Sequence, residues 1–286
     1  MKSTSQTHAT PAFELVFSAG DKWVDAAVKL RTHQHASCLE IDNLCEKLQT
    51  EASSPAPRNC MGFLSANPPN SSMCYCVDIA PTVQERRQII TLHQLLCSTQ
   101  QYSRFPFFER DRLQLAIILS SSLLQLHSTP WLQDLWTTKD IVFRLCCGDL
   151  DGEAVVQPYV SQTFPGATSY EPRHPPPMVR NAALYALGKV LIQLVENKPL
   201  INDEGSTVTL AGGSSDPEQE SAARLERTIY RKAGRTWADV IRRCLYCDFG
   251  TDTDNAALDN DEFTRCVYSQ VVYPLTEALK NLGDPL

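Results

Sequence analysis

Short apolar segments separated by turn residues occupy the first 80 residues of the chain. Segments of this length, bounded by glycine, proline, asparagine or serine, predict β-strands. Four strands are predicted, at Phe13–Phe17, Ala26–Leu30, Cys60–Leu64 and Met73–Ile79. From Ser37 to Leu48 the apolar residues recur at helical spacing, which predicts a helix between the second and third strands. Residues 1–12 are polar and are expected to be disordered.

Long helical patterns replace the strands after Pro81. Arg110–His127 and Val179–Asn197 are apolar almost all round, which is typical of helices at the centre of a helical domain. We expect these two helices to touch and to be the most buried in the chain. The stretch Gln157–Pro177 between them contains three consecutive prolines. It predicts a long loop, because proline fits neither a helix interior nor a central strand.

The last third of the chain predicts three more helices from their boundary residues. They are expected at residues 217–234, 236–250 and 259–283. Asp216 supplies an N-cap and Pro217 a favourable first helical residue, and Gly234 is expected to end the first of these helices. Pro274 is expected to kink or divide the last one.

Together these patterns predict an α+β, predominantly helical protein with two lobes. We place a small α/β lobe at residues 1–80 and a helical domain at residues 81–286, with a hinge near Ile79–Ile90. A hydrophobic content of 43% over 286 residues is sufficient for a substantial core.

Charge and cysteine content argue against several classes of protein. The 26 basic and 33 acidic residues give a net charge of −7, the wrong sign for binding nucleic acid or an anionic membrane. No apolar run approaches the roughly 20 residues that span a bilayer, and the N-terminus lacks the apolar stretch of a secretory signal. The 11 cysteines are scattered singly and odd in number, which is typical of buried thiols in a reducing compartment. We therefore expect a cytoplasmic protein with no membrane span.

The order of the predicted elements resembles that of a protein kinase. Ala26-Ala27-Val28-Lys29 resembles the kinase strand that carries the phosphate-pairing lysine, and Glu46 stands on the helix that follows. Leu126-His127-Ser128 resembles the end of the helix before the catalytic loop, and Leu184–Gly188 resembles the central helix of the large lobe. The resemblance implies a protein-kinase-like fold with a reduced small lobe and a helical large lobe.

The chain resembles more closely a fungal family of unknown function that has a degenerate kinase-like domain, a pseudokinase. That family occurs beside prion-inhibition and NOD-like-receptor modules. The segments that carry the resemblance are Ile41–Cys45, Asp111–His127, Thr129–Leu132, Thr138–Ile141, Ala238–Leu245 and Val271–Leu275. This resemblance implies a role in fungal self/non-self recognition or programmed cell death.

Most residues that transfer phosphate in active kinases are missing. An ungapped comparison from His127 onward sets Gln133-Asp134-Leu135 at the position of the kinase His-Arg-Asp triplet, so leucine replaces the catalytic aspartate. Asp140 stands where a metal-binding asparagine belongs, and an aspartate can hold Mg²⁺. No Asp-Phe-Gly follows in the next segment, where Asp149, Asp151 and Gln157–Val160 offer no equivalent, and only Gly20 precedes Lys29 where a glycine-rich loop belongs.

Lys29, Glu46 and Asp140 are the candidate residues of a vestigial nucleotide site. An ion pair between Lys29 and Glu46 would be a remnant of that site, although both residue types are common and usually solvated. Pro130 and Trp131 form a candidate interaction surface. The alternative for Trp131 is that it anchors the core, as large aromatic residues beside buried helices usually do.

Two other features suggest chemistry but have simpler interpretations. Cys244 and Cys247 form half of a zinc or redox motif without a second pair, so we interpret them as two helix-borne thiols and expect no metal. His127 ends an apolar helix, where histidine more often caps carbonyl groups or packs than catalyses.

The sequence therefore predicts a catalytically inactive, kinase-like scaffold or regulatory module that binds protein partners and needs no cofactor. Two alternatives stay open. One is a pseudokinase that binds a nucleotide or another small molecule, and the other is a residual phosphotransferase.

Overall fold

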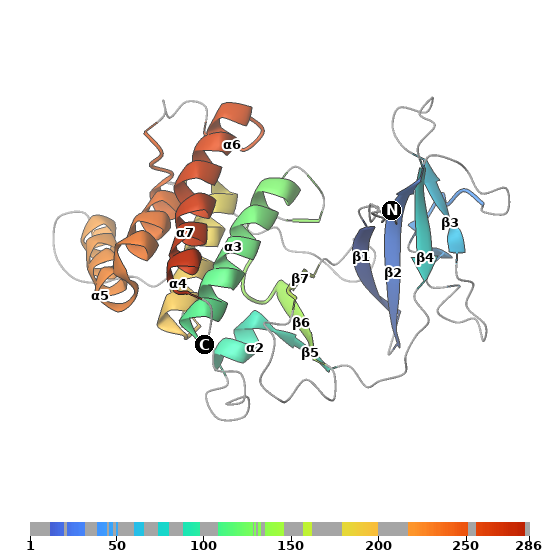
Figure 1. Cartoon of the computed structure of the whole chain (residues 1–286), viewed down its shortest axis with the longest axis horizontal. Coiled ribbons are helices and arrows are strands. Elements are labelled where there is room, and N and C mark those ends of the chain that lie inside the picture. The colour runs from blue at the N-terminus through green and yellow to red at the C-terminus, as the bar shows by residue number, and fades with distance from the viewer. Residues whose placement is uncertain are drawn as a thin grey trace, which may run out of the picture. The chain divides into compact units, whose positions relative to one another are not determined.

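The structure is a computed structural model of the chain, which divides into two compact units, Met1–Glu85 and Arg86–Leu286 (Figure 1). The described residues are 12–19, 22–31, 39–44, 46–47, 50, 60–65, 74–79, 88–97, 108–127, 129, 131–132, 135–145, 157–161, 179–199, 217–250 and 256–283. The sequence pattern places its change of character after residue 80, and the units divide between residues 85 and 86.

The first unit contains one antiparallel sheet of four strands in the order β1-β2-β4-β3. The strands are β1 (Ala12–Ala19), β2 (Lys22–Arg31), β3 (Cys60–Ser65) and β4 (Cys74–Ile79). All four strand predictions are therefore confirmed, because each short apolar segment between turn residues forms one strand.

The two faces of this sheet differ in what they bury. One apolar cluster comprises Ala26, Val28, Ile41, Met61, Val77 and Ile79, with Leu44 and Leu64 packed against it. A second cluster comprises Phe63, Cys74 and Cys76. Lys29 lies opposite Cys76 in the β2–β4 register, so it shares a face with the second cluster rather than with Val28.

The predicted helix between the second and third strands starts later than expected. Among the described residues, 44, 46, 47 and 50 are helical, whereas residues 39–43 are not. The backbone N–H of Ile41 donates to the carbonyl of Phe63 at 2.8 Å, and the N–H of Phe63 donates to the carbonyl of Leu39 at 3.0 Å. Because β3 satisfies these backbone groups, residues 39–43 are extended and the prediction of a helix from Ser37 is wrong for them.

Gly62 allows this close approach of two backbones. A Cβ at this position would lie 2.4 Å from the Leu39 carbonyl oxygen and 2.7 Å from Ile41 Cγ1. The residue also has φ of +153° and lies where the pairing of β3 with β4 shifts register. Only glycine fits both conditions without displacing the neighbouring chain.

The second unit is built around two helices, α3 (Glu109–Leu126) and α4 (Ala182–Glu196). They contact each other, as predicted. Helix α4 buries most of its residues, and Asn181 caps its N-terminus by accepting from the Leu184 N–H at 3.0 Å. Helix α3 exposes Glu109, Gln114 and Gln125, so the expectation of burial all round is wrong for α3 and correct for α4.

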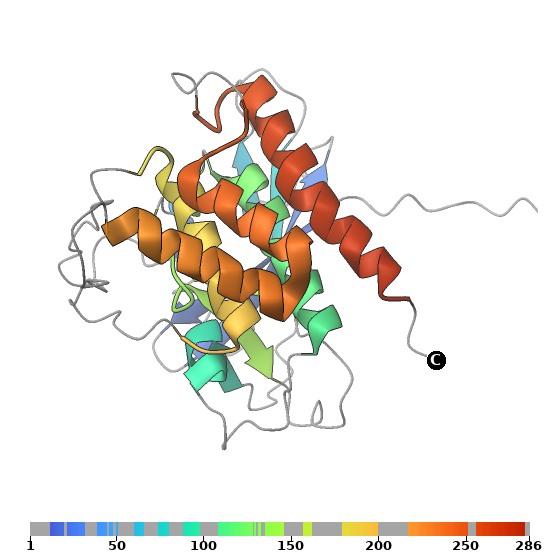
Figure 2. The same ribbon diagram turned by 90° about the vertical axis from the view of Figure 1, so that its left-hand side faces the viewer.

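Among the C-terminal helices, the predicted interruption at Gly234 is confirmed, whereas the helix predicted to reach Gly250 ends at Tyr246. Cys247 follows it in a turn with φ of 54°, so the expectation of two helix-borne thiols is wrong for Cys247. Helix α5 (Pro217–Tyr246) is two helical segments joined at Gly234, whose φ of 82° and ψ of −177° are not helical. Helix α6 (Asp261–Val267) continues through a π-helical turn, η3 (Tyr268–Val272), into α7 (Tyr273–Asn281). Figure 2 shows α5 changing direction between its two segments and α6 to α7 running on as one long rod. The helix is therefore not divided at Pro274, and the irregularity near it is the π-helical turn that ends at Val272.

A small sheet that the sequence pattern does not predict as a unit lies beside these helices (Figure 1). Strands β5 (Gln88–Thr91), β6 (Ile141–Leu145) and β7 (Tyr159–Val160) pair in this order, and α2 (Leu92–Cys97) follows β5 directly. Strand β7 lies inside the stretch predicted as a loop, which corrects that prediction for two residues. Ile141 pairs with Val160, and the N–H of Ser161 donates to the Asp140 carbonyl at 2.7 Å, so a distant partner stabilises this strand.

Helices α4 and α5 pack closely because α4 has a glycine at the contact. A Cβ on Gly188 would lie 2.9 Å from Leu245 Cδ2 and 3.2 Å from Cys244 Cβ. Both values are shorter than the usual separation of about 3.5–4.0 Å between carbon atoms in contact.

Within the described part of the chain, no helix combines the length and the apolar character that crossing a bilayer requires.

Candidate functional site

The segment aligned with the kinase catalytic loop connects the end of α3 to β6. Gln133, Asp134 and Pro130 lie outside the described residues. Leu135 lies in a turn and is half-buried, and the next residue, Trp136, is buried with an exposed fraction of 5%. The position of the missing catalytic aspartate thus holds a half-buried leucine beside a buried tryptophan.

Asp140 uses its carboxylate to stabilise the turn that leads into β6. Its Oδ2 accepts from the backbone N–H of Thr137 at 2.7 Å and from Thr137 Oγ1 at 3.0 Å. The N–H of Asp140 donates to the Thr137 carbonyl at 3.0 Å, which closes the same turn. The described residues contain no group of three or more histidine, cysteine, aspartate or glutamate side chains placed to hold a metal ion.

Lys29 forms its ion pair with Asp78. The Lys29 Nζ lies 3.2 Å from Asp78 Oδ2, and the exposed fractions of the two side chains are 40% and 22%. Glu46 is exposed, and no ion pair joins it to Lys29 within the described part of the unit. The alternation of side chains along a strand explains why Lys29 does not reach Glu46. Lys29 projects from the face opposite Val28, whereas Val28 belongs to the cluster against which the helical residue Leu44 packs.

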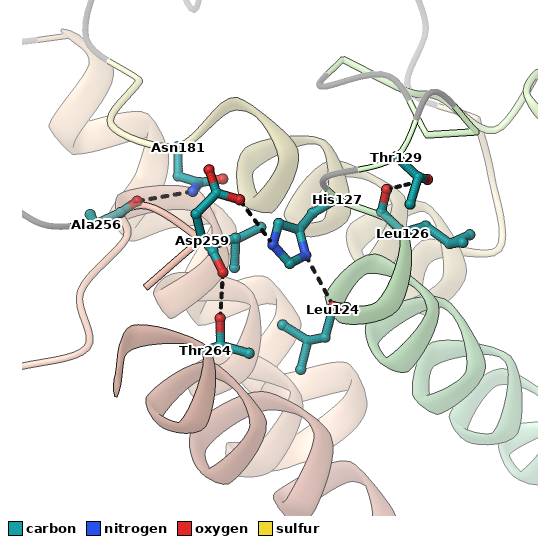
Figure 3. A network of polar contacts seen from close by, with 9 residues as sticks. Leu124, Leu126, His127, Thr129, Asn181, Ala256, Asp259 and Thr264 are labelled. Atoms are coloured by element: carbon teal, nitrogen blue, oxygen red, sulfur yellow. Dashed lines mark hydrogen bonds and ion pairs between the residues drawn. The ribbon is translucent and has the colours of Figure 1, made fainter. Parts of the chain in front are cut away.

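His127 occupies the junction where α3 ends (Figure 3). Its Nδ1 lies 3.0 Å from the Leu124 carbonyl and its Nε2 lies 3.4 Å from Asp259 Oδ1. Nδ1 donates to the carbonyl, so the ring can cap the helix, as the sequence predicts. The imidazole is 15% exposed, whereas the Asp259 side chain is 80% exposed, which places the pair at the edge of the core.

Further polar contacts tie the segment before α6 to its neighbours (Figure 3). Asn181 Nδ2 donates to the Ala256 carbonyl at 3.0 Å, and Thr264 Oγ1 donates to the Leu258 carbonyl at 2.6 Å. Asn181 therefore caps α4 and also holds residue 256, a double role that its position in the sequence does not reveal. These contacts anchor a connection and give no arrangement of nucleophile, base and oxyanion donor.

Trp131, the described member of the candidate interaction surface, is half-buried beside the end of α3. Thr129 Oγ1 donates to the Leu126 carbonyl at 2.7 Å, and the N–H of Trp131 donates to the same hydroxyl at 3.3 Å. The turn thus holds the tryptophan backbone against the helix. Its role in recognition stays a prediction.

Cys244 and Cys247 are both buried near the end of α5. Burial raises the pKa of both thiols, and the neighbouring Cys247 contributes to the rise at Cys244. A raised pKa keeps a thiol protonated and poorly nucleophilic. Their environment agrees with two packed thiols.

A groove of about 430 Å³ lies between α3 and the α6–η3 segment. It is lined by Ser121, Leu124, Gln125, Thr264, Arg265 and Tyr268. The sequence gives no signal for it, because these residues come from two helices far apart in the chain and have no motif in common.

Comparison with known proteins gives matches of two kinds. Among solved structures, the pseudokinase domain of BIR2, an immune regulator of the RLK/Pelle family, matches with 14% identity and a TM-score of 0.41 over 98% of this chain and 80% of that chain. The PAN3 pseudokinase of Neurospora crassa matches with 7% identity and a TM-score of 0.36, over 99% of this chain and 63% of that chain. No curated protein sequence matches significantly. Residues 1–282 match the domain of unknown function DUF7580, and the chain therefore belongs to the DUF7580 family.

Proposed function

We propose that this chain is a catalytically inactive, kinase-like domain that acts as a scaffold or regulatory module by binding other proteins. The observation that carries the proposal is Leu135, which the sequence alignment sets at the position of the kinase catalytic aspartate and which is half-buried beside the buried Trp136. A hydrocarbon side chain neither accepts a proton nor orients a hydroxyl group, and general-base catalysis contributes about 10²–10⁴-fold to a rate.

The neighbouring acidic residue supports the same conclusion. Thr137 donates two hydrogen bonds to Asp140 Oδ2, so this oxygen already serves the turn before β6. Phosphoryl transfer depends on positioning and on metal ions that neutralise the transferred group. The Asp-Phe-Gly of this sequence, Asp248–Gly250, follows α5 rather than the segment after Asp140, and Asp248 pairs with Arg242 at 2.9 Å.

A phosphate-transfer assay with radiolabelled ATP and Mg²⁺ tests this proposal. We expect no transfer to the chain itself or to a generic protein substrate above a no-enzyme control, while an active kinase in parallel labels the substrate. Leu135→Asp should also stay inactive, because one restored carboxylate supplies neither the metal ligand nor the glycine-rich loop. Activity of the native chain that Lys29→Met abolishes would overturn the proposal and support a residual phosphotransferase.

A second candidate function is nucleotide binding without transfer, through Lys29 of the first unit. The observation that favours it is the partly exposed Lys29, which a carboxylate partner, Asp78, holds on the sheet. A ligand that binds only the native state raises its stability by about 2.7 kcal/mol at a concentration 100 times its Kd. An ATP-dependent rise in melting temperature that Lys29→Met removes would support this candidate, and an unchanged melting temperature in saturating ATP and Mg²⁺ would reject it.

The biological setting is part of the proposal. The resemblance of segments such as Thr129–Leu132 to a fungal family supports a cytoplasmic role in self/non-self recognition or cell death. Deletion of the gene in its host followed by an incompatibility assay tests that setting. Loss of the cell-death response is expected, and an unchanged response would reject it.

A further inference from the structure

A cluster of positive charge on α5 contrasts with the net charge of −7 of the chain. Residues 227–243 contain six basic side chains and one acidic side chain, a local balance of +5. The basic residues are Arg227, Arg231, Lys232, Arg235, Arg242 and Arg243. Such a concentration of like charge attracts anionic groups.

Three of these cations are already paired with carboxylates. Lys232 pairs with Glu196, Arg235 with Asp239 at 3.4 Å, and Arg242 with Asp248 at 2.9 Å. Such pairs neutralise part of the helix and fix it against its surroundings.

Arg227 and Arg231 form no ion pair in the described part of the chain, and both are exposed. They lie four residues apart and so project from one face of the helix, where like charges at this spacing are destabilising by a few tenths of a kcal/mol. A cation near the C-terminal end of a helix interacts favourably with the helix dipole. This effect explains why an arginine is tolerated at position 231, in the last turn before Gly234, but not at position 227, a full turn earlier. Two unpaired arginines on one face are therefore not explained by the stability of the helix.

The same surface presents an aromatic residue and is rigidly supported. Tyr230 lies beside Arg231 and is 57% exposed, whereas the adjacent Ile229 is fully buried. Ile229 and the pair between Lys232 and Glu196 attach this segment to the core. Arginine and tyrosine are both enriched at the centres of protein interfaces.

We infer that Arg227, Tyr230 and Arg231 form a docking surface for an acidic segment of a partner protein. Each guanidinium can bind a carboxylate through two parallel hydrogen bonds, and the tyrosine ring supplies apolar contact area. Because Glu196 and Asp239 already pair with Lys232 and Arg235, the two remaining arginines suit a short acidic peptide better than a long nucleic-acid backbone. The inference rests on the proposed function and names the chemistry of the partner.

The test uses a fluorescein-labelled hexaglutamate peptide and the full chain, with binding followed by fluorescence anisotropy at low salt and at 150 mM NaCl. We expect binding that weakens as salt rises. Arg227→Glu with Arg231→Glu should weaken binding at least about tenfold, because two charge-assisted contacts become repulsive. Tyr230→Ala should weaken it by about threefold or more.

A matched control changes the net charge equally at a distant place. Arg180, which precedes the N-terminus of α4, and Arg265 on α6 are exposed residues of the same unit, and Arg180→Glu with Arg265→Glu should change affinity by less than about twofold. Equal losses in the two double variants, or no binding of the peptide by the native chain, would overturn the inference. Tighter binding of a single-stranded oligothymidine than of the peptide would do so as well. Arg227→Gln with Arg231→Gln is a milder second variant, which removes the two positive charges without adding negative ones. The phosphate-transfer assay on the same samples tests the proposed function separately from the docking surface.

Discussion

Replacing Gly188 with alanine tests the close packing of α4 on α5. Alanine is preferred over glycine in an exposed helix interior by about 1 kcal/mol, so this substitution is normally stabilising. Here the added Cβ would lie 2.9 Å from Leu245 Cδ2, 3.0 Å from Leu245 Cγ and 3.2 Å from Cys244 Cβ. Overpacking a core costs about 1–3 kcal/mol, which offsets or exceeds the helical gain.

The expected net effect of Gly188→Ala is a loss of about 1 kcal/mol in the free energy of unfolding. For a domain of this size, that loss lowers the melting temperature by about 2–4 °C. Thermal unfolding followed by tryptophan fluorescence measures it, because Trp136 and Trp237 are buried in the second unit.

A double-mutant cycle with Leu245→Ala isolates the steric contribution. In the Leu245→Ala background the two closest contacts disappear, so Gly188→Ala should become neutral or stabilising by up to about 1 kcal/mol. The sign of the alanine effect therefore depends on Leu245. If Gly188→Ala raises the melting temperature of the native chain by a few degrees, the close contact between α4 and α5 does not exist.

Two further predictions concern backbone packing and thiol reactivity. Gly62→Ala should destabilise the first unit by at least about 2 kcal/mol, because the new Cβ would clash with the Leu39 carbonyl. The loss should appear as faster hydrogen exchange in β3 and β4, and unchanged exchange would contradict the close packing at Gly62. Cys244 and Cys247 should resist alkylation at pH 8 in the native state while the exposed Cys97 reacts, because a raised pKa leaves little thiolate. Peptide mapping after iodoacetamide treatment checks this prediction. Labelling of Cys244 at the rate of Cys97 would refute it.

Local signals in the sequence were sufficient for the two irregular positions of the C-terminal helices. Gly234 interrupts α5 because its positive φ suits glycine, and Pro274 follows the widened turn because proline offers no N–H to the preceding turn. Each of these effects depends on one residue and its nearest neighbours along the chain. Such effects can be read from a single sequence.

Distant partners determined what the sequence could not predict. Residues 39–43 have helical apolar spacing, yet Ile41 is hydrogen bonded to Phe63 on a strand that follows some twenty residues later. The pairing of Ile141 with Val160 likewise makes a strand within a proline-rich stretch. Long-range pairing of this kind overrides local propensity.

The candidate site shows the same limit at the level of side chains. Alignment with a kinase strand identified Lys29 as the candidate lysine. It did not indicate that Asp78 on a neighbouring strand forms an ion pair with Lys29. Arg227 and Arg231 are visible in the sequence as charges, whereas their lack of ion-pair partners became visible only when the positions of Glu196 and Asp239 were known.

The π-helical turn between α6 and α7 keeps the helix in phase with the core. The buried residues Phe263, Val267, Val271 and Leu275 recur every fourth position, so twelve residues separate the first from the last. A regular α-helix would make about 3.3 turns over twelve residues and would point Leu275 away from Phe263. The N–H of Tyr273 donates instead to the Tyr268 carbonyl five residues earlier, which adds residues to one turn and returns Leu275 to the buried side. The continuous helix from α6 to α7 therefore contains one residue more than a regular α-helix needs to keep the same side toward the core. Deleting one residue within the π-helical turn would give a regular helix with that side still facing the core.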